Sequence, residues 1–288
     1  MPADTDHDWE ILANQDPYWA VLTQDRFRTK AMDDTARRDF FLSGEKYVDW
    51  VFTMIRDHID SQFNPATGLD FGCGVGRLIL PMSRRCRTAV GIDVSDAMLQ
   101  EAQRNCRAEK VENVSLVKGD DKCAGLEHGF DFINSFIVFQ HIPCDRGIGL
   151  FRRLVELLND SGVAAIHITY SRSQSPVMAD AASYDPQKKE SPRGARSHLA
   201  ALGRAVRNRL ARMFQGRTVA SDSHPETANA STPVMQMNSY SLNPLFQILQ
   251  HAGVREIHAA LSDHDGSFGT VLFFKKGPGL YAFPALKT

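Results

Sequence analysis

The sequence has few cysteines, and their spacing argues against two kinds of small, cross-linked domain. Its five cysteines are scattered, and none stands in a Cys-x-x-Cys pair or at the Cys/His spacing of a zinc site. An odd, scattered set of thiols is typical of a reducing compartment. We therefore expect free thiols, no disulfide framework and no metal centre.

Long apolar runs and an excess of either charge are also missing. No run approaches the roughly 20 apolar residues that span a bilayer, and the first ten residues, MPADTDHDWE, do not have the pattern of a signal peptide. The 33 Lys and Arg against 34 Asp and Glu give a net charge of -1, which argues against a protein that wraps nucleic acid. We expect a cytoplasmic protein. With 43% hydrophobic residues in 288, the chain is long enough for a large core.

Four regions follow from changes of pattern along the chain. They are an N-terminal helical cap, an α/β core, a segment rich in Ser, Pro, Ala and Arg, and a helix followed by two strands. In the cap, apolar residues at spacings of three and four predict a helix over 45–63. The expected bounds of the four regions are 1–63, 64–170, 171–238 and 239–288.

The core alternates short β-rich runs with helical stretches, which predicts a parallel sheet covered by helices on both faces. Helical periodicity covers 95–109, which Ser95 would cap, and 146–159. Strand-like runs lie at 67–72, 88–94, 113–117, 130–139 and 162–170.

The fourth region predicts an antiparallel hairpin at the end of the chain. An amphipathic helix over 242–252 ends at Gly253, a suitable cap. Strand-like runs at 254–261 and 269–276 follow, with a turn at Asp263–Gly266 between them.

The strongest local signal is a glycine loop between a strand and a helix. Gly72, Gly74 and Gly76 permit a sharp turn and let a ligand approach the backbone closely, and the following helix directs free N–H groups toward it. Arg77 stands where a dinucleotide fingerprint needs a third glycine. Asp70, two positions before the loop, would repel a pyrophosphate but suits an ammonium or a sulfonium.

Two further acidic positions follow the next strands. Asp93 comes about 20 residues after the first glycine, where a carboxylate can accept hydrogen bonds from both hydroxyls of a ribose. Asp120 and Asp121 follow the third strand-like run. Either could accept a hydrogen bond from an adenine amino group, or both could be ordinary loop acids.

Together, the segments LDFGCGVGR, GIDVS, KGDD and FDFINSFIVFQHIP resemble the motifs of class I S-adenosylmethionine-dependent methyltransferases. The resemblance is close over residues 45–170 and looser over the final hairpin. It implies an α/β, Rossmann-like fold: a seven-stranded, mostly parallel sheet with helices on both faces and an antiparallel last strand. The N-terminal helical cap and an insertion after the fifth strand would be added to this core.

The resemblance also implies a role for each motif. S-adenosylmethionine would be the cofactor, with Asp70 and the glycine loop around its methionine part, Asp93 at the ribose and Asp120 or Asp121 at the adenine. The FQHIP stretch would lie under the methyl donor. Further residues implied beside the cofactor are Cys73, Arg77, Val94 and Met98.

For catalysis, His141 is the candidate base, because an imidazole can take a proton near neutral pH. The alternative is that it shapes the cofactor pocket. Tyr170 is the last residue of the fifth strand-like run and a candidate for an acceptor pocket, and Tyr18 and Tyr240 are weaker candidates. No NPPY-type run follows the fourth strand, so a nucleic-acid base is not expected as the acceptor. The absence of a metal cluster also argues against a divalent-ion mechanism.

A basic block within the third region suggests an anionic partner. Residues 193–217 hold seven arginines, no acid and an apolar stripe at helical spacing. Such a helix would bind an anionic membrane surface or an acidic acceptor, or would simply be a solvated surface helix.

The sequence leaves three function classes open. The first is a methyltransferase acting on a small-molecule, lipid or glycan acceptor, with oxygen as the expected site. The second is a non-catalytic module that binds an adenosyl ligand for regulation. A NAD-dependent oxidoreductase is the third, and Asp70 and Arg77 argue against it.

Overall fold

The computed structural model describes residues 5–126, 129–172, 233–264 and 266–277. The predicted basic helix over 193–217 lies outside the described residues. Among those described, no helix is long and apolar enough to cross a membrane.

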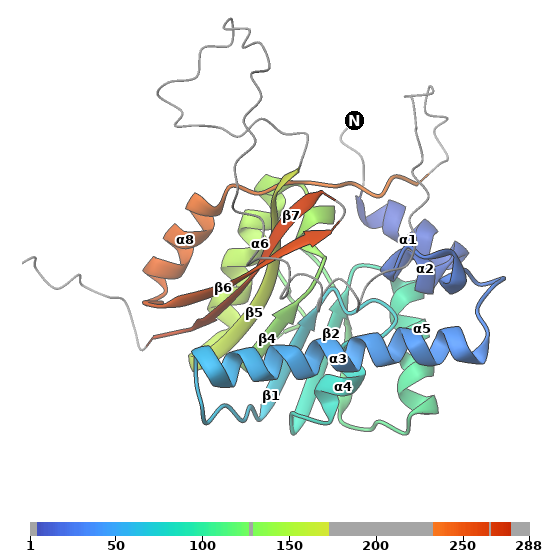
Figure 1. The fold of residues 1–288 in the computed structure, drawn as a ribbon, viewed down its shortest axis with the longest axis horizontal. Coiled ribbons are helices and arrows are strands. Elements are labelled where there is room, and N and C mark those ends of the chain that lie inside the picture. Colours follow the sequence, from blue (N-terminus) through green and yellow to red (C-terminus); the bar gives the residue numbers. More distant parts are fainter. Residues whose placement is uncertain (1–4, 127–128, 173–232, 265, 278–288) are drawn as a thin grey trace, which may run out of the picture. The chain divides into compact units, whose positions relative to one another are not determined.

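A seven-stranded sheet forms the centre of the fold, in the order β3-β2-β1-β4-β5-β7-β6 (Figure 1). Six strands run parallel, and β7 is antiparallel to both of its neighbours, β5 and β6. This confirms the predicted sheet and its antiparallel last strand. The strands are β1 Thr67–Phe71, β2 Thr88–Asp93, β3 Val114–Lys118, β4 Phe130–Ser135, β5 Leu158–Arg172, β6 Ile257–His264 and β7 Ser267–Lys275.

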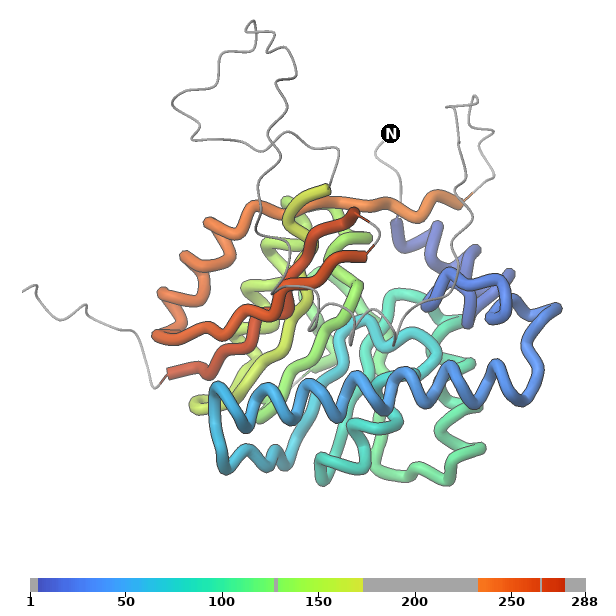
Figure 2. The backbone as a smooth tube through the Cα atoms, in the orientation of Figure 1, coloured from blue at the N-terminus to red at the C-terminus, as the bar shows by residue number. Residues whose placement is uncertain are grey.

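Helices cover both faces of the sheet, as predicted (Figures 1 and 2). On one face, α3 buries Val48, Val51 and Phe52 against Phe132 and Phe273 of the sheet. On the other, apolar residues of α6 and α8 pack on β1, β4, β5 and β7. The helices are α1 Thr5–Gln15, α2 Pro17–Val21, α3 Asp34–His58, α4 Ile79–Ser83, α5 Asp96–Ala108, α6 Cys144–Leu157 and α8 Leu242–His251, with short 3-10 turns η1 Asp25–Phe27 and η2 Phe139–His141.

Several ends of elements differ from the sequence prediction. Helix α3 starts at Asp34, because the side chain of Asp33 caps it by accepting from Ala36 N. Strand β4 ends at Ser135 rather than at residue 139, since Ile137 adopts a φ of +59° that a strand cannot continue through. Strand β6 starts at Ile257 rather than at residue 254, because Val254 N donates to Leu249 O and completes the end of α8. The predicted cap of α5 is confirmed.

The N-terminal elements form a third apolar cluster above the glycine loop. Leu12 and Tyr18 from the first two helices and Phe40 from α3 pack with Val75 and Met98. This arrangement brings the start of the chain to the carboxyl ends of β1 and β2, where open α/β sheets bind their ligands.

Candidate cofactor and active site

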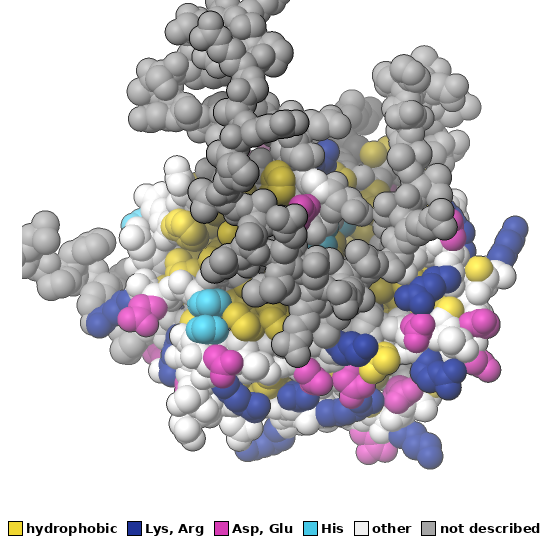
Figure 3. Space-filling view, viewed as in Figure 1, with side chains coloured by type: hydrophobic (Ala, Val, Ile, Leu, Met, Phe, Trp, Pro, Cys, Tyr) yellow, Lys and Arg dark blue, Asp and Glu magenta, His cyan; other side chains and the backbone are white. Residues whose placement is uncertain are grey.

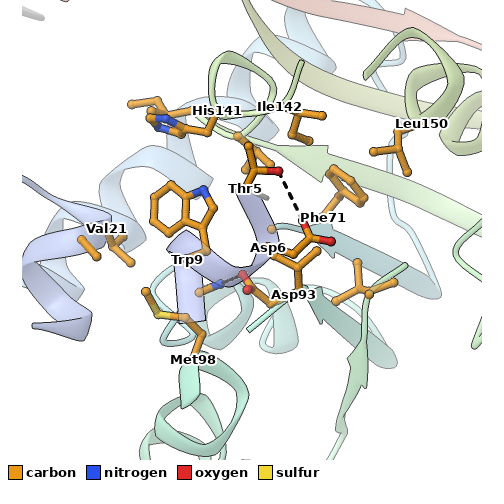
Figure 4. Close-up of a pocket in the computed structure, with 18 of the residues that line it drawn as sticks. Thr5, Asp6, Trp9, Val21, Phe71, Asp93, Met98, His141, Ile142 and Leu150 are labelled. Carbon is orange, nitrogen blue, oxygen red and sulfur yellow. Dashed lines mark hydrogen bonds between the residues drawn. The ribbon is translucent and has the colours of Figure 1, made fainter. Parts of the chain in front are cut away.

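A cavity opens at the carboxyl ends of β1, β2 and β4, beneath α1 (Figure 4). Its empty volume, including the open mouth, is about 960 Å³. Side chains that are distant in the sequence line it: Thr5, Asp6, Trp9, Ala20, Val21, Phe71, Gly72, Gly74, Arg77, Ile92, Asp93, Val94, Met98, Gly119, Asp120, Phe136, Ile137, Val138, His141, Ile142, Arg146 and Leu150.

The glycine loop forms the floor of this cavity, and its three glycines have different roles. All three have positive φ, at 74°, 51° and 92° for Gly72, Gly74 and Gly76. A Cβ on Gly72 would lie 2.4 Å from a methyl of Val138, so only glycine fits there. Gly76 and the buried Cys73 do not line the cavity. Gly76 instead sits against Ala102 of α5.

Asp70 and Arg77 are opposite charges, both buried beside the loop, yet no ion pair joins them, and only Arg77 lines the cavity. Asp70 is 1% exposed; Oδ1 accepts from Asn134 Nδ2 at 2.9 Å, while Oδ2 has no hydrogen-bond partner among the described residues. Arg77 lines the cavity and donates through Nη1 to Ser43 Oγ, and its Nε likewise has no partner in this part of the chain. Burial raises the pKa of Asp70 to about 7 and lowers that of Arg77 to about 10.

The acids that follow β2 and β3 are held differently. Asp93 lines the cavity; its Oδ2 accepts from Gly74 N at 2.8 Å and its Oδ1 from Ser95 N, while burial raises its pKa. Asp120 also lines the cavity, and its Oδ1 accepts from the backbone N–H groups of Lys122 and Ala124. Asp121 does not line it and pairs with Arg146 instead. Of the two adjacent acids, Asp120 is therefore the one available to a ligand.

His141 lies at the cavity wall with partners on both ring nitrogens. Nδ1 is 2.7 Å from the carbonyl oxygen of Gln236, which places the proton on Nδ1, and Nε2 is 3.2 Å from the amide nitrogen of Gln140. The ring also meets Trp9 edge-on, with 5.1 Å between ring centroids. Burial lowers the pKa of His141 to about 4, so the imidazole is neutral at physiological pH.

None of the three candidate tyrosines lines this cavity. The hydroxyl of Tyr18 bonds to Glu101 and Asn105 of α5, and that of Tyr240 donates to the carbonyl oxygen of Ile142 at 2.7 Å. Tyr170, at the end of β5, is half-buried. Val94 and Met98 do line the cavity.

The structure adds residues that the sequence analysis missed. Thr5, Asp6 and Trp9 reach the cavity from α1, Phe136 follows β4, and Arg146 belongs to α6. The lining residues of α1 could have been found from the spacing of Asp6, Trp9 and Glu10, because residues three and four apart lie on one side of a helix.

Comparisons with known proteins agree with this geometry. Residues 69–162 match the family model described as "Methyltransferase domain". The magnesium protoporphyrin IX methyltransferase ChlM of Synechocystis, solved with S-adenosylhomocysteine, matches at a TM-score of 0.54 and 16% identity, over 94% of this chain and 100% of that chain. The N-methyltransferase NodS of Bradyrhizobium japonicum, also with S-adenosylhomocysteine, gives 0.52 and 13% over 95% and 99%. These likenesses show the fold.

A curated relative matches over a shorter stretch. The 23S rRNA (uracil(1939)-C(5))-methyltransferase RlmD of Mannheimia succiniciproducens is 34% identical over 73 residues, or 25% of this chain and 14% of that enzyme. The chain thus spans about one seventh of that relative's length. Residues 69–162 thus match a methyltransferase domain, and the seven-stranded topology and the glycine loop around it are those of the class I S-adenosylmethionine-dependent methyltransferase fold.

Proposed function

We propose that the protein transfers a methyl group from S-adenosylmethionine to a hydroxyl oxygen of a small, uncharged acceptor. The observation that carries the cofactor assignment is the buried couple of Asp70 and Arg77 beside the glycine loop, in which Asp70 Oδ2 and Arg77 Nε have no hydrogen-bond partner in the described part of the chain. The two charges attract each other, yet a buried polar atom without a partner is costly. The α-ammonium and α-carboxylate of a methionine would supply the missing partners.

The remaining polar residues of the cavity fit the rest of this cofactor. Asp93 would hold the ribose hydroxyls, and Asp120 would accept from the adenine amino group. Phe71 and Met98 supply apolar surface for the purine. When bound, S-adenosylmethionine supplies a methyl group already activated by the sulfonium. The chain's own residues then need only orient the acceptor, exclude water and accept a proton.

The uncharged character of the acceptor follows from what remains in the cavity. Once Arg77, Asp93 and Asp120 hold the cofactor, the other charged lining residues of the described part, Asp6 and Arg146, neutralise each other. The rest of the lining is largely apolar or aromatic, including Trp9 and Phe136. A charged acceptor would lose its hydration here without a compensating partner.

His141 is the proposed base. Its proton sits on Nδ1, held by Gln236, so Nε2 carries the lone pair. An acceptor hydroxyl that displaced the Gln140 amide could donate to Nε2. With its pKa lowered to about 4, His141 is a weaker base than a free imidazole, and the imidazolium formed when it accepts the proton would pass that proton on to solvent.

The RNA acceptor of the curated relatives is the competing assignment. Methylation at a uracil carbon needs a nucleophile to activate the ring, for which a thiolate is suited. Burial raises the pKa of all five thiols, so each stays protonated at neutral pH. This disfavours chemistry through a cysteine.

The test is transfer of radiolabelled methyl groups from S-adenosylmethionine into fractions of a cell extract. We expect label in the organic-soluble, low-molecular-weight fraction. An Asp93→Ala variant serves as the negative control and should transfer little label. Label in ribonuclease-sensitive material would support the RNA assignment and overturn ours.

A further inference from the structure

Helix α1 lies across the mouth of the cavity and faces it with one side. Asp6, Trp9 and Glu10 are spaced at i, i+3 and i+4, so they share that side. Thr5, Asp6 and Trp9 line the cavity, and the indole of Trp9 lies between Val21 and His141 in Figure 4. A nucleoside bound in the cavity would therefore lie against this side of α1.

One anchor of α1 lies at the start of α5, close to Asp93. Glu10 Oε2 accepts from the hydroxyl of Ser95 at 2.7 Å and from Ala97 N at 3.4 Å. A carboxylate at the N-terminus of a helix compensates the free N–H groups and the positive end of the helix dipole. This anchor belongs to the wall that holds the ribose acid.

The second anchor is Arg146, which joins three elements at the other end of the cavity. Its Nη1 and Nη2 donate to the two carboxylate oxygens of Asp6 at 2.6 and 2.8 Å, and Nη1 also donates to Thr5 Oγ1. Its Nε donates to Asp121, in the loop after β3. The partners on α1 are 140 residues away in the sequence, and the side chain of Arg146 is only 22% exposed. Bidentate, charge-assisted pairs of this kind fix geometry as well as add binding energy.

We propose that Arg146 is a positioning residue that latches α1 over the bound cofactor and so controls cofactor exchange. The inference rests on the proposed function. Arg146 holds Asp6 over the cavity, and by drawing Asp121 away it leaves Asp120 as the acid that faces the ligand. Cofactor release requires the Asp6–Arg146 pair to break, so the latch keeps the cofactor in place while acceptors exchange.

The chain offers a matched control on the same helix. Arg153 lies two turns further along α6, and it also reaches the loop after β3, donating to Lys122 O at 3.0 Å, with Glu156 as its acidic partner. It neither lines the cavity nor contacts α1 in the described structure. Arg146→Gln and Arg153→Gln thus remove the same charge from the same helix, and only the first opens the latch.

The experiment measures release of radiolabelled S-adenosylhomocysteine from the full chain after a chase with unlabelled ligand. Opening a partly exposed bidentate pair should accelerate release about 5- to 10-fold in Arg146→Gln, against less than about twofold in Arg153→Gln. Asp6→Asn should accelerate release similarly, and the double variant should be no faster than either single one. Wild-type release should also quicken as salt rises, because the pair is partly screened, and this dependence should be lost in Asp6→Asn.

The outcomes separate the latch from the function on which it rests. Wild-type protein that retains no S-adenosylhomocysteine would contradict the proposed function, and the latch with it. Retention by the wild type with equal release from Arg146→Gln and Arg153→Gln would overturn the latch alone. Should Arg146→Gln fail to fold, Asp6→Asn, which leaves the Arg146–Asp121 pair in place, decides by the same comparison.

Discussion

The pH dependence of cofactor binding should report the ionisation of Asp70. In the ligand-free protein burial holds the pKa of this carboxyl at about 7. An ammonium beside it favours the ionised form, so binding below pH 7 must release a proton from Asp70. The dissociation constant of S-adenosylmethionine therefore rises as the pH falls.

The size of this effect can be worked out from the ionised fraction. If only the ionised form binds, a pKa of about 7 makes the dissociation constant at pH 5.5 about 25-fold larger than at pH 7.5. Asp70→Asn has no carboxyl to titrate at this position. This variant should bind S-adenosylmethionine more weakly than the wild type at pH 7.5, and its dissociation constant should change little with pH. Titration calorimetry at several pH values measures the dissociation constants of both proteins.

A truncated ligand supplies the matched control. 5′-Methylthioadenosine has the nucleoside and the sulfur but lacks the amino and carboxyl groups, so its affinity for the wild type should change less over the same pH range, with only the ribose acid Asp93 contributing. An equal slope for the truncated ligand, or a slope that persists in Asp70→Asn, would refute the assignment of Asp70 to the ammonium.

Three further predictions concern single residues of the site. Arg77→Met should weaken S-adenosylmethionine binding by about 1.5–3 kcal/mol and leave 5′-methylthioadenosine binding unchanged in calorimetry, because only the former has a carboxylate; equal losses would place Arg77 elsewhere. Gly72→Ala should lower the free energy of unfolding in urea by about 2–4 kcal/mol, from its positive φ and the clash with Val138. Gly149→Ala, in α6 with nothing within 4 Å of the added methyl, should not destabilise. His141→Ala should lower turnover about 10²–10⁴-fold at nearly constant cofactor affinity if it is the base; a loss of affinity instead would show that it shapes the pocket.

Local chemistry made much of the fold and the floor of the site predictable. The glycines of the loop and the Ser95 cap act through neighbouring backbone, so their roles can be inferred from short segments. The alternation of strands and helices predicts the mostly parallel sheet, and the motifs predict at which strand ends the acidic residues stand. Asp93 lines the cavity where the pattern placed it.

Long-range packing explains what the sequence could not show. The ion pair between Asp6 and Arg146 joins residues 140 positions apart, and no local sequence pattern predicts it. The sequence offers Tyr18 as a candidate for the acceptor pocket, yet its hydroxyl bonds to Glu101 and Asn105 of α5. The end of β4 depended on the positive φ of Ile137, a β-branched residue that rarely adopts it.

The most direct test of the account is the affinity of the wild-type protein for S-adenosylmethionine and for NAD, with Asp93→Ala beside Asp96→Ala. Asp96 is an exposed acid three positions further on, paired with Lys118, and it does not line the cavity. We predict that S-adenosylmethionine binds and NAD does not. Asp93→Ala should weaken binding by about 1.5–3 kcal/mol, while Asp96→Ala should leave it nearly unchanged. Binding of NAD without S-adenosylmethionine, or equal effects of the two substitutions, would contradict the assignment.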